Sequence, residues 1–395
     1  MKNTLAAGAV LVCAAAVPAH ADLLDWNVSP FTADVGQWTF TLGGAADGSL
    51  YTADQPDFRG LDQSGATGAA WVSDKLERTY DDGMVISLRS VFEIFHDKLS
   101  GDNYGSYFVQ KVYGTVQTGL GRAEIGMTDG AAYSLAVVGP EVDNFTSLDN
   151  PNATFFVNPL TNRAFIGIFS LNSAVESSLN YAKISYYTPR LFGVQIGASF
   201  TPSEGKDVVP FINPGPRVDN RQRGIWEGAL SYQGDSGRFS YGASATIAVA
   251  HGVHKTLGHD GMIDWAIGAQ TDYSLTDDLK LSVGGAYRQT NLYTFDINDA
   301  LARGNTGALH TSSMLTYGSW MVGGEYSTGS AGGSLGLPTL GVHGAEASVG
   351  YTLNTNAQIT AGWQQWIYGR NKGLFYDGAD HISMDAGFLH LNFHI

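Results

Sequence analysis

The residues with the clearest potential to act on ions lie in one long segment without regular alternation, residues 128–179. It holds five acidic residues against one base, and its local charge is therefore −4: Asp129, Glu141, Asp143, Asp149 and Glu176 against Arg163. Long loops within compact domains usually carry function. Because a surplus of one charge sign attracts ions of the other sign, the chemistry that this segment suggests is electrostatic.

Side chains that could bind a metal or catalyse a reaction are sparse elsewhere. His251, His254 and His259 lie with Asp260 in one stretch between expected strands. Imidazoles at this spacing could bind a divalent metal, but a solvated loop explains them better. The sequence shows no phosphate-binding glycine loop and no catalytic carboxylate pair that can be placed. We therefore expect neither an enzyme nor a bound cofactor.

The N-terminus has the pattern of a secretory signal peptide. An apolar run from Leu5 to Val17 follows Lys2 and precedes the small-residue cleavage pattern Ala19-His20-Ala21. The run is too short to span a bilayer. We expect residues 1–21 to be removed, which leaves residues 22–395 as a single domain.

Charge and composition exclude several classes of protein. The whole chain has a formal net charge of −15, and loss of Lys2 with the signal peptide would make this −16. A basic groove for nucleic acid is therefore not expected. The single cysteine, Cys13, lies within the signal peptide, so the mature domain is expected to have no disulfide. No later stretch approaches the roughly 18 consecutive apolar residues of a transmembrane helix.

Alternation of apolar and polar residues, the period of a β-strand, runs through most of the mature sequence. In residues 238–250, Tyr241 and Ile247 lie on one face while Ser244 and Thr246 lie on the other. Most alternating segments have the roughly 9–11 residues that a tilted strand needs to cross a bilayer. Sixteen strands are predicted, at 36–45, 69–80, 84–96, 104–118, 121–127, 180–188, 193–202, 224–233, 237–250, 262–273, 279–290, 306–317, 319–328, 341–351, 357–368 and 381–395.

The connections between these strands alternate in length, and aromatic residues mark one end of the strands. Short turns such as 81–83 and 119–120 alternate with longer loops such as 46–68 and 128–179. Aromatic residues flank the short turns: Tyr80, Tyr187, Tyr232, Tyr273, Tyr317 and Tyr351 before them, and Phe192, Phe239 and Trp320 after them. Both features are typical of barrels in an outer membrane. We predict an all-β, 16-stranded antiparallel transmembrane β-barrel with lipid outside and water inside, because so wide a lumen cannot be filled by small polar side chains.

Two hairpins resemble those of Gram-negative porins of the alphaproteobacterial type. They are YFVQKVYGTVQTGLGRAEIGM at residues 107–127 and KISYYTPRLFGVQIGASFTP at residues 183–202. The resemblance implies a homotrimer of 16-stranded barrels in the Gram-negative outer membrane, and a third loop that folds into each lumen. The chain departs from the family at Gln110 and Met127, where arginine is usual, and at the last residue, Ile395, where phenylalanine is usual.

By this resemblance residues 128–179 form the constriction loop, and the barrel wall facing it should carry the opposite charge. Arg89 shares one face of VISLRSVFEIF with Glu93, and Lys183 belongs to the second hairpin. Charges of opposite sign across a narrow water column would orient dipolar solutes. The candidate constriction residues are Glu141, Asp143, Arg89, Lys183 and Glu93, although each is also compatible with an ordinary solvated position.

The leading functional prediction is passive diffusion of small hydrophilic solutes and ions, with a preference for cations. Two alternatives remain open: a substrate-selective channel, which should show aromatic residues spaced along the lumen, and a barrel that anchors an adhesin or an enzyme. Expected partners are a second and third copy of the chain, outer-membrane lipid and lipopolysaccharide. Divalent cations at Asp299, Asp377 and Asp380 could bridge to lipopolysaccharide, although solvation alone explains these residues as well.

Overall fold

The structure is a computed structural model of the whole chain. It describes residues 29–54, 64–96, 109–149, 157–158, 163–164, 173–178, 180–203, 223–251, 261–291, 294–295, 302–333, 340–369 and 381–395. The expected signal peptide lies outside the described residues.

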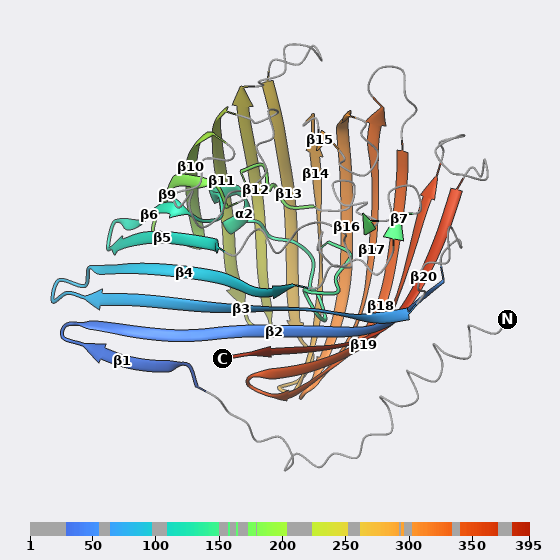
Figure 1. Cartoon of the computed structure of the whole chain (residues 1–395), viewed down its shortest axis with the longest axis horizontal. Coiled ribbons are helices and arrows are strands. Elements are labelled where there is room, and N and C mark those ends of the chain that lie inside the picture. Colours follow the sequence, from blue (N-terminus) through green and yellow to red (C-terminus); the bar gives the residue numbers. More distant parts are fainter. Residues whose placement is uncertain are drawn as a thin grey trace.

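Antiparallel strands joined in chain order build almost the entire molecule (Figure 1). Sixteen of them form the barrel: β2 (Trp38–Asp54), β3 (Ser64–Thr79), β4 (Val85–His96), β5 (Val109–Thr118), β6 (Gly121–Met127), β9 (Ala182–Tyr187), β10 (Val194–Ser203), β11 (Arg223–Ser236), β12 (Phe239–His251), β13 (Gly261–Ser274), β14 (Leu279–Thr290), β16 (Ala302–Tyr317), β17 (Trp320–Gly333), β18 (Leu340–Asn354), β19 (Ala357–Gly369) and β20 (His381–His394). No helix among the described residues is long and apolar enough to span a membrane.

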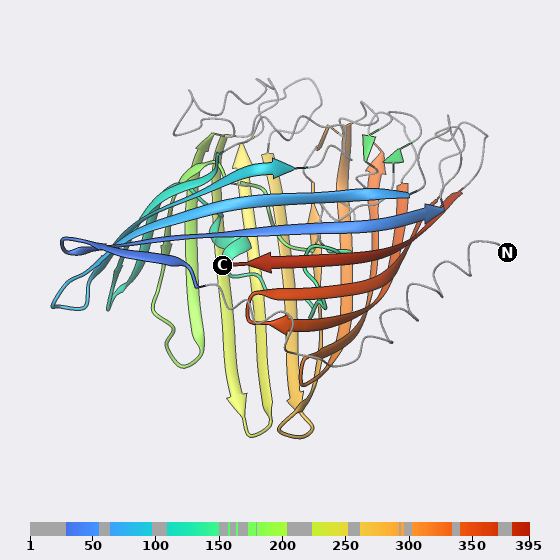
Figure 2. The same cartoon turned by 60° about the horizontal axis from the view of Figure 1, so that its bottom comes forward.

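The sheet closes on itself through its first and last long strands. β2 pairs with β3 on one edge and with β20 on the other, where Leu50 lies opposite Leu389. Figure 2 shows the red C-terminal strand beside the blue N-terminal one. Closure leaves these long strands without an unpaired edge, which is how a β-structure satisfies its backbone in a membrane. The predicted 16-stranded antiparallel barrel is confirmed.

Short elements supplement the barrel. β1 (Phe31–Val35) pairs with the first residues of β2, and β15 (Thr294–Phe295) pairs with the start of β16. β7 (Val157–Asn158) and β8 (Arg163–Ala164) pair with each other in a separate two-stranded sheet. The described part of the chain also contains one short helix, α2 (Ala131–Ser134).

The predicted strands correspond one to one with the barrel strands, and the largest difference is in β2. Residues 46–54 were expected in a loop but continue that strand. Around this point the sequence reads Gly-Gly-Ala-Ala-Asp-Gly-Ser at residues 43–49, which has no large side chain to show alternation. Pairing with both β3 and β20 fixes these residues as strand. β1 was not predicted at all.

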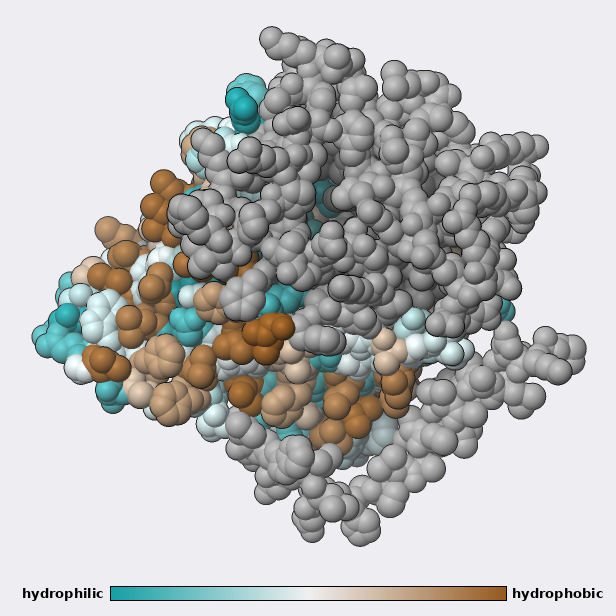
Figure 3. All heavy atoms as spheres, viewed as in Figure 1, coloured by the Kyte–Doolittle hydropathy of each residue, from teal (hydrophilic) through white to brown (hydrophobic). Residues whose placement is uncertain are grey.

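The two faces of the strands differ as the alternation predicts. Ile196 and Ile263 point outward and are 53% and 52% exposed, whereas Ser199 and Asp264 point inward and are 3% and 0% exposed. In Figure 3, hydrophobic side chains gather on the outer surface in the region of β2–β6. The apolar residues therefore form an outer band, and the polar residues line the interior.

Aromatic residues flank the short turns largely as expected, with one exception. Phe239 stacks on Tyr273 and Trp320 packs against Tyr351, each pair formed across neighbouring strands. Tyr187 was expected in this outer girdle, but its side chain is fully buried in the lumen. Its neighbour Tyr186 points outward instead and donates a hydrogen bond to the Leu120 carbonyl at 2.6 Å. Alternation allows only one of two adjacent tyrosines to face outward.

Candidate functional site

The loop of residues 128–179 follows β6, and its described residues near both ends, 128–149 and 173–178, lie against the inner wall of the barrel. Its first residues form α2, whose backbone is held by two strands. The Ala131 N–H donates to Ser199 Oγ of β10 at 3.1 Å, and the Ala132 N–H donates to Glu227 Oε2 of β11 at 3.1 Å. Glu227 also accepts a hydrogen bond from Ser199 at 3.0 Å, which fixes the carboxylate beneath the helix.

From α2 the loop crosses the inner wall to the far strands. The Val137 N–H donates to Ser244 Oγ of β12 at 2.8 Å, and Gln358 Nε2 of β19 donates to the Val142 carbonyl at 2.7 Å. These contacts carry the loop from β10 to β19 across the interior. The expected inward-folded third loop is therefore confirmed.

Glycines on the inner wall let the loop backbone come this close. A Cβ added at Gly268 of β13 would overlap the Val137 carbonyl, and one added at Gly350 of β18 would lie 2.9 Å from Val142 Cγ1. At Gly242 of β12 the same atom would make only ordinary contact, at 3.7 Å from a Val137 methyl group. The sequence showed these glycines on the polar face of their strands, but nothing in a single strand indicates that a distant loop packs there.

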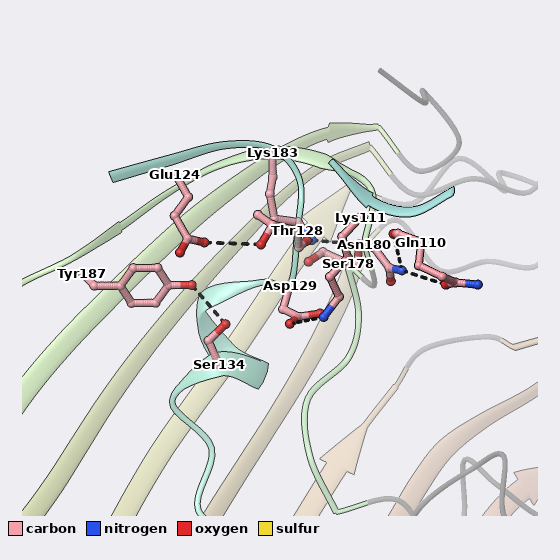
Figure 4. Close-up of polar contacts among 10 residues, drawn as sticks. All are labelled: Gln110, Lys111, Glu124, Thr128, Asp129, Ser134, Ser178, Asn180, Lys183 and Tyr187. Atoms are coloured by element: carbon pink, nitrogen blue, oxygen red, sulfur yellow. Dashed lines mark hydrogen bonds and ion pairs between the residues drawn. The ribbon is translucent and has the colours of Figure 1, made fainter. Parts of the chain in front are cut away.

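Lys183 binds the loop close to both of its ends. Its Nζ donates to the carbonyl of Thr128 at 2.6 Å and to that of Ser178 at 3.3 Å, so it joins the first and last parts of the loop (Figure 4). The side chain is 3% exposed. Beside it, Lys111 forms an ion pair with Asp129 at 2.6 Å. Lys183, predicted to face the loop acids across water, instead lies under the loop's ends.

Arg89 and Glu93 share the inner face of β4, as predicted. Arg89 lies opposite Lys75 of β3 in the sheet register, and its side chain is exposed. Within the described part of the chain, no ion pair joins it to an acid. Glu93 is buried and accepts a hydrogen bond from Gln110.

Glu141 and Asp143 lie in the loop but contact a different part of the wall. The Ser147 hydroxyl is 2.9 Å from Glu141 Oε1 and 2.8 Å from Glu325 Oε2 of β17. Asp143 Oδ2 lies 3.6 Å from His390 Nε2 of β20. Among the described residues, neither acid is paired with Arg89 or Lys183. The five candidate residues are thus divided between two sides of the lumen.

Sequence reasoning missed the wall residues under this part of the loop. Glu325 lies directly opposite Glu346 of β18, and Glu346 lies opposite Gln364 of β19. Gln364 Nε2 donates to Glu346 Oε2 at 2.8 Å and also to the loop carbonyl of Thr146. In the sequence each glutamate is one polar residue in an alternating strand. Only the register between strands shows that they are adjacent.

Two further contacts hold the returning arm of the loop. Asp149 accepts hydrogen bonds from the Ser173 N–H at 2.6 Å and from its hydroxyl at 2.9 Å. The Ser177 hydroxyl donates to Asp264 of β13 at 2.5 Å. Asp264 is itself bound by both Nε and Nη2 of Arg288 on β14, at 2.9 and 2.6 Å, and this ion pair is almost fully buried.

Burial and neighbouring carboxylates shift the loop's own titratable groups. Burial and then the charge of Glu325 raise the pKa of Glu141 well above its usual value. Partial burial and the carboxylates of Glu176 and Asp129 raise the pKa of the Tyr133 hydroxyl on α2. In both groups burial is the larger cause, and the neighbouring carboxylates add to it.

The predicted histidine site lies mostly beyond the described residues. His251 ends β12, while His254 and His259 lie outside the described residues. Within the described ranges, no three His, Cys, Asp or Glu side chains are arranged to hold a metal ion.

The arrangement therefore comprises two inner surfaces with a loop between them. We call the inner faces of β3–β6 and β9, with Lys75, Arg89, Lys111, Arg122 and Lys183, the basic wall. We call the inner faces of β16–β20, with Glu325 and Glu346, the acidic wall. The loop segment 141–149 covers the acidic wall, whereas Arg89 and Lys75 of the basic wall remain accessible to solvent.

Comparison with known proteins agrees with this architecture. Among solved structures, the OmpF of Salmonella typhi in complex with daunomycin superimposes with a TM-score of 0.59 at 13% identity, covering 92% of this chain and all of that one. The anion-selective porin from Comamonas acidovorans gives 0.57 at 15% identity over 91% of this chain and all of that one. The OmpT outer-membrane protein of Vibrio cholerae, in a structure titled as its trimer form, gives 0.55 at 13% identity over 91% of this chain and 99% of that one.

At these identities the structures establish the fold alone. No curated protein sequence matches the chain significantly. The sequence model of the Gram-negative porins matches residues 6–381, nearly the whole chain. This match, together with a closed 16-stranded barrel that holds an inward loop, shows that the chain belongs to the Gram-negative porin family and is an outer-membrane protein.

Proposed function

We propose that this porin is a general diffusion pore for small hydrophilic solutes and ions, and that it prefers cations. The observation that carries the proposal is the loop fixed across the interior by backbone hydrogen bonds to Ser199, Glu227 and Ser244. Such a loop narrows the lumen without closing a site around one ligand. Passage through a pore of this kind depends on solute size and charge.

The preference for cations rests on the lumen charges. Among the described residues of β10–β14 and β16–β20, the inward carboxyls Glu227, Asp264, Asp272, Glu325 and Glu346 outnumber the inward bases Lys280 and Arg288. The loop adds further acids. Basic residues gather on β3–β6 and β9, but Lys111 and Arg122 are paired with Asp129 and Glu124. A net negative lumen raises the local concentration of cations.

We further propose that the pore assembles as a homotrimer. The V. cholerae structure titled as a trimer shares this fold. On the outer face of β3, Asp74 accepts a hydrogen bond from Ser90 of β4 at 3.3 Å. An outward carboxylate is costly against lipid but acceptable against protein. Folded samples should migrate as a large species before boiling and near the monomer afterwards, and identical migration in both would contradict the trimer.

Planar-bilayer recordings test the pore directly. Purified protein should give stable conductance steps, and in a potassium chloride gradient the sign of the reversal potential should show potassium crossing more readily than chloride. A reversal potential of the opposite sign would refute the cation preference but leave the pore. Absence of conductance from folded protein would refute the diffusion pore.

A further inference from the structure

The contact between the loop and the acidic wall contains more acceptors than donors. Ser147 Oγ already accepts a hydrogen bond from the Asp149 N–H at 3.1 Å, and it lies within hydrogen-bond distance of Glu141 Oε1 and Glu325 Oε2. A hydroxyl has one proton and can donate to only one of these oxygens. The other carboxyl must therefore donate a proton of its own to Ser147.

The geometry places that proton on Glu141. Glu325 Oε2 also accepts the Leu148 N–H at 2.9 Å, so this oxygen is the acceptor of two donors, the Leu148 N–H and the Ser147 hydroxyl. Glu141 has no such second donor among the described residues. The hydrogen-bond chain then runs from the Glu141 acid to Ser147, and from Ser147 to the Glu325 carboxylate.

Among the described residues, no fixed positive charge is paired with the carboxyls of this hydrogen-bond chain. β17 contributes Glu325, β18 contributes Glu346, and the loop contributes Asp143 and Asp149. Three bases on the described strands lie near these acids: His390 of β20, near Asp143, His310 of β16, near Asp149, and Arg288 of β14, which interacts with Asp149 but is paired with Asp264. Each histidine is held through Nδ1 by a serine, His390 by Ser49 and His310 by Ser327. No described lysine or arginine is paired with these carboxyls.

We propose that the loop segment 141–149 is latched to the acidic wall by a proton on Glu141. Loss of this proton would place two facing carboxylates about Ser147 and release the segment from β17 and β18. The inference rests on the proposed diffusion pore and adds a regulation to it. As the pH rises, the lumen therefore becomes more negative, and the loop segment at its narrowest part is held less tightly.

The direction of the pH dependence follows from the upward shift of the Glu141 pKa. Burial raises this pKa, so the docked loop binds a proton that the released loop would lose at neutral pH. A group of this kind favours docking below its raised pKa and disfavours docking as the pH increases through it. The latch is therefore closed in acid and opens toward alkaline pH.

The experiment measures conductance and reversal potential of reconstituted pores from about pH 5 to about pH 9, the range in which buried carboxyls titrate. For the wild type we expect the permeability ratio of potassium over chloride to increase about twofold or more. Glu141→Gln keeps the neutral hydrogen-bonding shape, so its profile should be flat in this range. The matched control is Glu77→Gln on β3, a lumen acid paired with Lys75 at 2.9 Å, and it should keep the wild-type profile.

The possible outcomes distinguish a failure of the latch from a failure of the pore. A wild-type profile in Glu141→Gln would overturn the inference, and so would a flat wild-type profile in a conducting pore. A chain that folds but forms no pore would instead refute the proposed function. Should Glu141→Gln fail to assemble, Ser147→Ala provides the second test: it removes the bridging hydroxyl and should move the transition to lower pH, whereas an unmoved transition would overturn the latch.

A disulfide tests whether the segment moves. Val142→Cys with Gly350→Cys would place two thiols where Val142 Cγ1 already lies 2.9 Å from the position of the added Cβ, within reach of a disulfide. The oxidised pore should lose the pH-dependent change in conductance, and the reduced pore should keep it. A change that persists in the oxidised pore would show that the segment is not released.

Discussion

The basic wall and the acidic wall both consist of strands with alternating side chains, but their charged side chains differ in burial and in partners. On the basic wall, Lys111 and Arg122 are partly exposed and each has an acidic partner, at 2.6 and 3.1 Å. On the acidic wall, Glu325 and Glu346 are buried side by side beneath the loop. Exposed charges are screened by water, whereas buried ones need donors or protons from the protein. The difference shows that the loop determines which lumen charges act on a passing ion.

The largest effect should come from a charge pair buried under the loop. Arg288→Met leaves Asp264 buried without its bidentate partner, and uncompensated buried charges destabilise proteins by about 3–5 kcal/mol. Lys111→Met breaks the partly exposed pair with Asp129, which should cost under about 1 kcal/mol. Urea-unfolding midpoints of the two variants would measure the contrast. Equal losses would show that the loop does not shield the buried pair from water.

An intermediate effect should follow from filling the space that the loop backbone occupies. Gly268→Ala puts a Cβ into the Val137 carbonyl, so we expect the loop to shift and the single-channel conductance to rise, with a loss of about 1–3 kcal/mol in stability. Gly242→Ala, one strand away, meets Val137 only at ordinary contact distance and is the control. If both variants conduct like the wild type, the loop is not held against β13 as described.

A smaller effect should come from Arg89, an exposed base on the basic wall. Arg89→Gln removes a charge that no described acid pairs, so the potassium preference should increase. Across about 8 Å of water two unit charges interact by roughly 0.5 kcal/mol, which corresponds to a change of about twofold in the permeability ratio. Glu141→Gln measured in mildly acidic buffer should change the ratio much less, because its raised pKa keeps Glu141 neutral there. A larger effect from Glu141→Gln would reverse our comparison of the two walls.

The alternation along each strand, which a local sequence contains, was sufficient to predict the barrel. The side-chain period places Ile247 outside and Thr246 inside regardless of the neighbouring strands. The acidic composition and length of residues 128–179 likewise indicated a functional loop, and the resemblance to porins implied that this loop folds inward. Where local alternation is absent, as in residues 43–49 of β2, or ambiguous, as in the pair Tyr186 and Tyr187, the prediction was incomplete or wrong.

What the sequence determined by itself is the strand period, the number of long strands and the presence of an acidic loop, because each depends on residues close together in the chain. Only the tertiary structure decided which wall the loop covers. Ser147 joins Glu141 to Glu325, and the Val137 carbonyl lies against Gly268. Each of these pairs is separated by more than a hundred residues in the sequence. Barrel closure and strand register bring these residues together. No local pattern contains that information, because register depends on the pairing of whole strands.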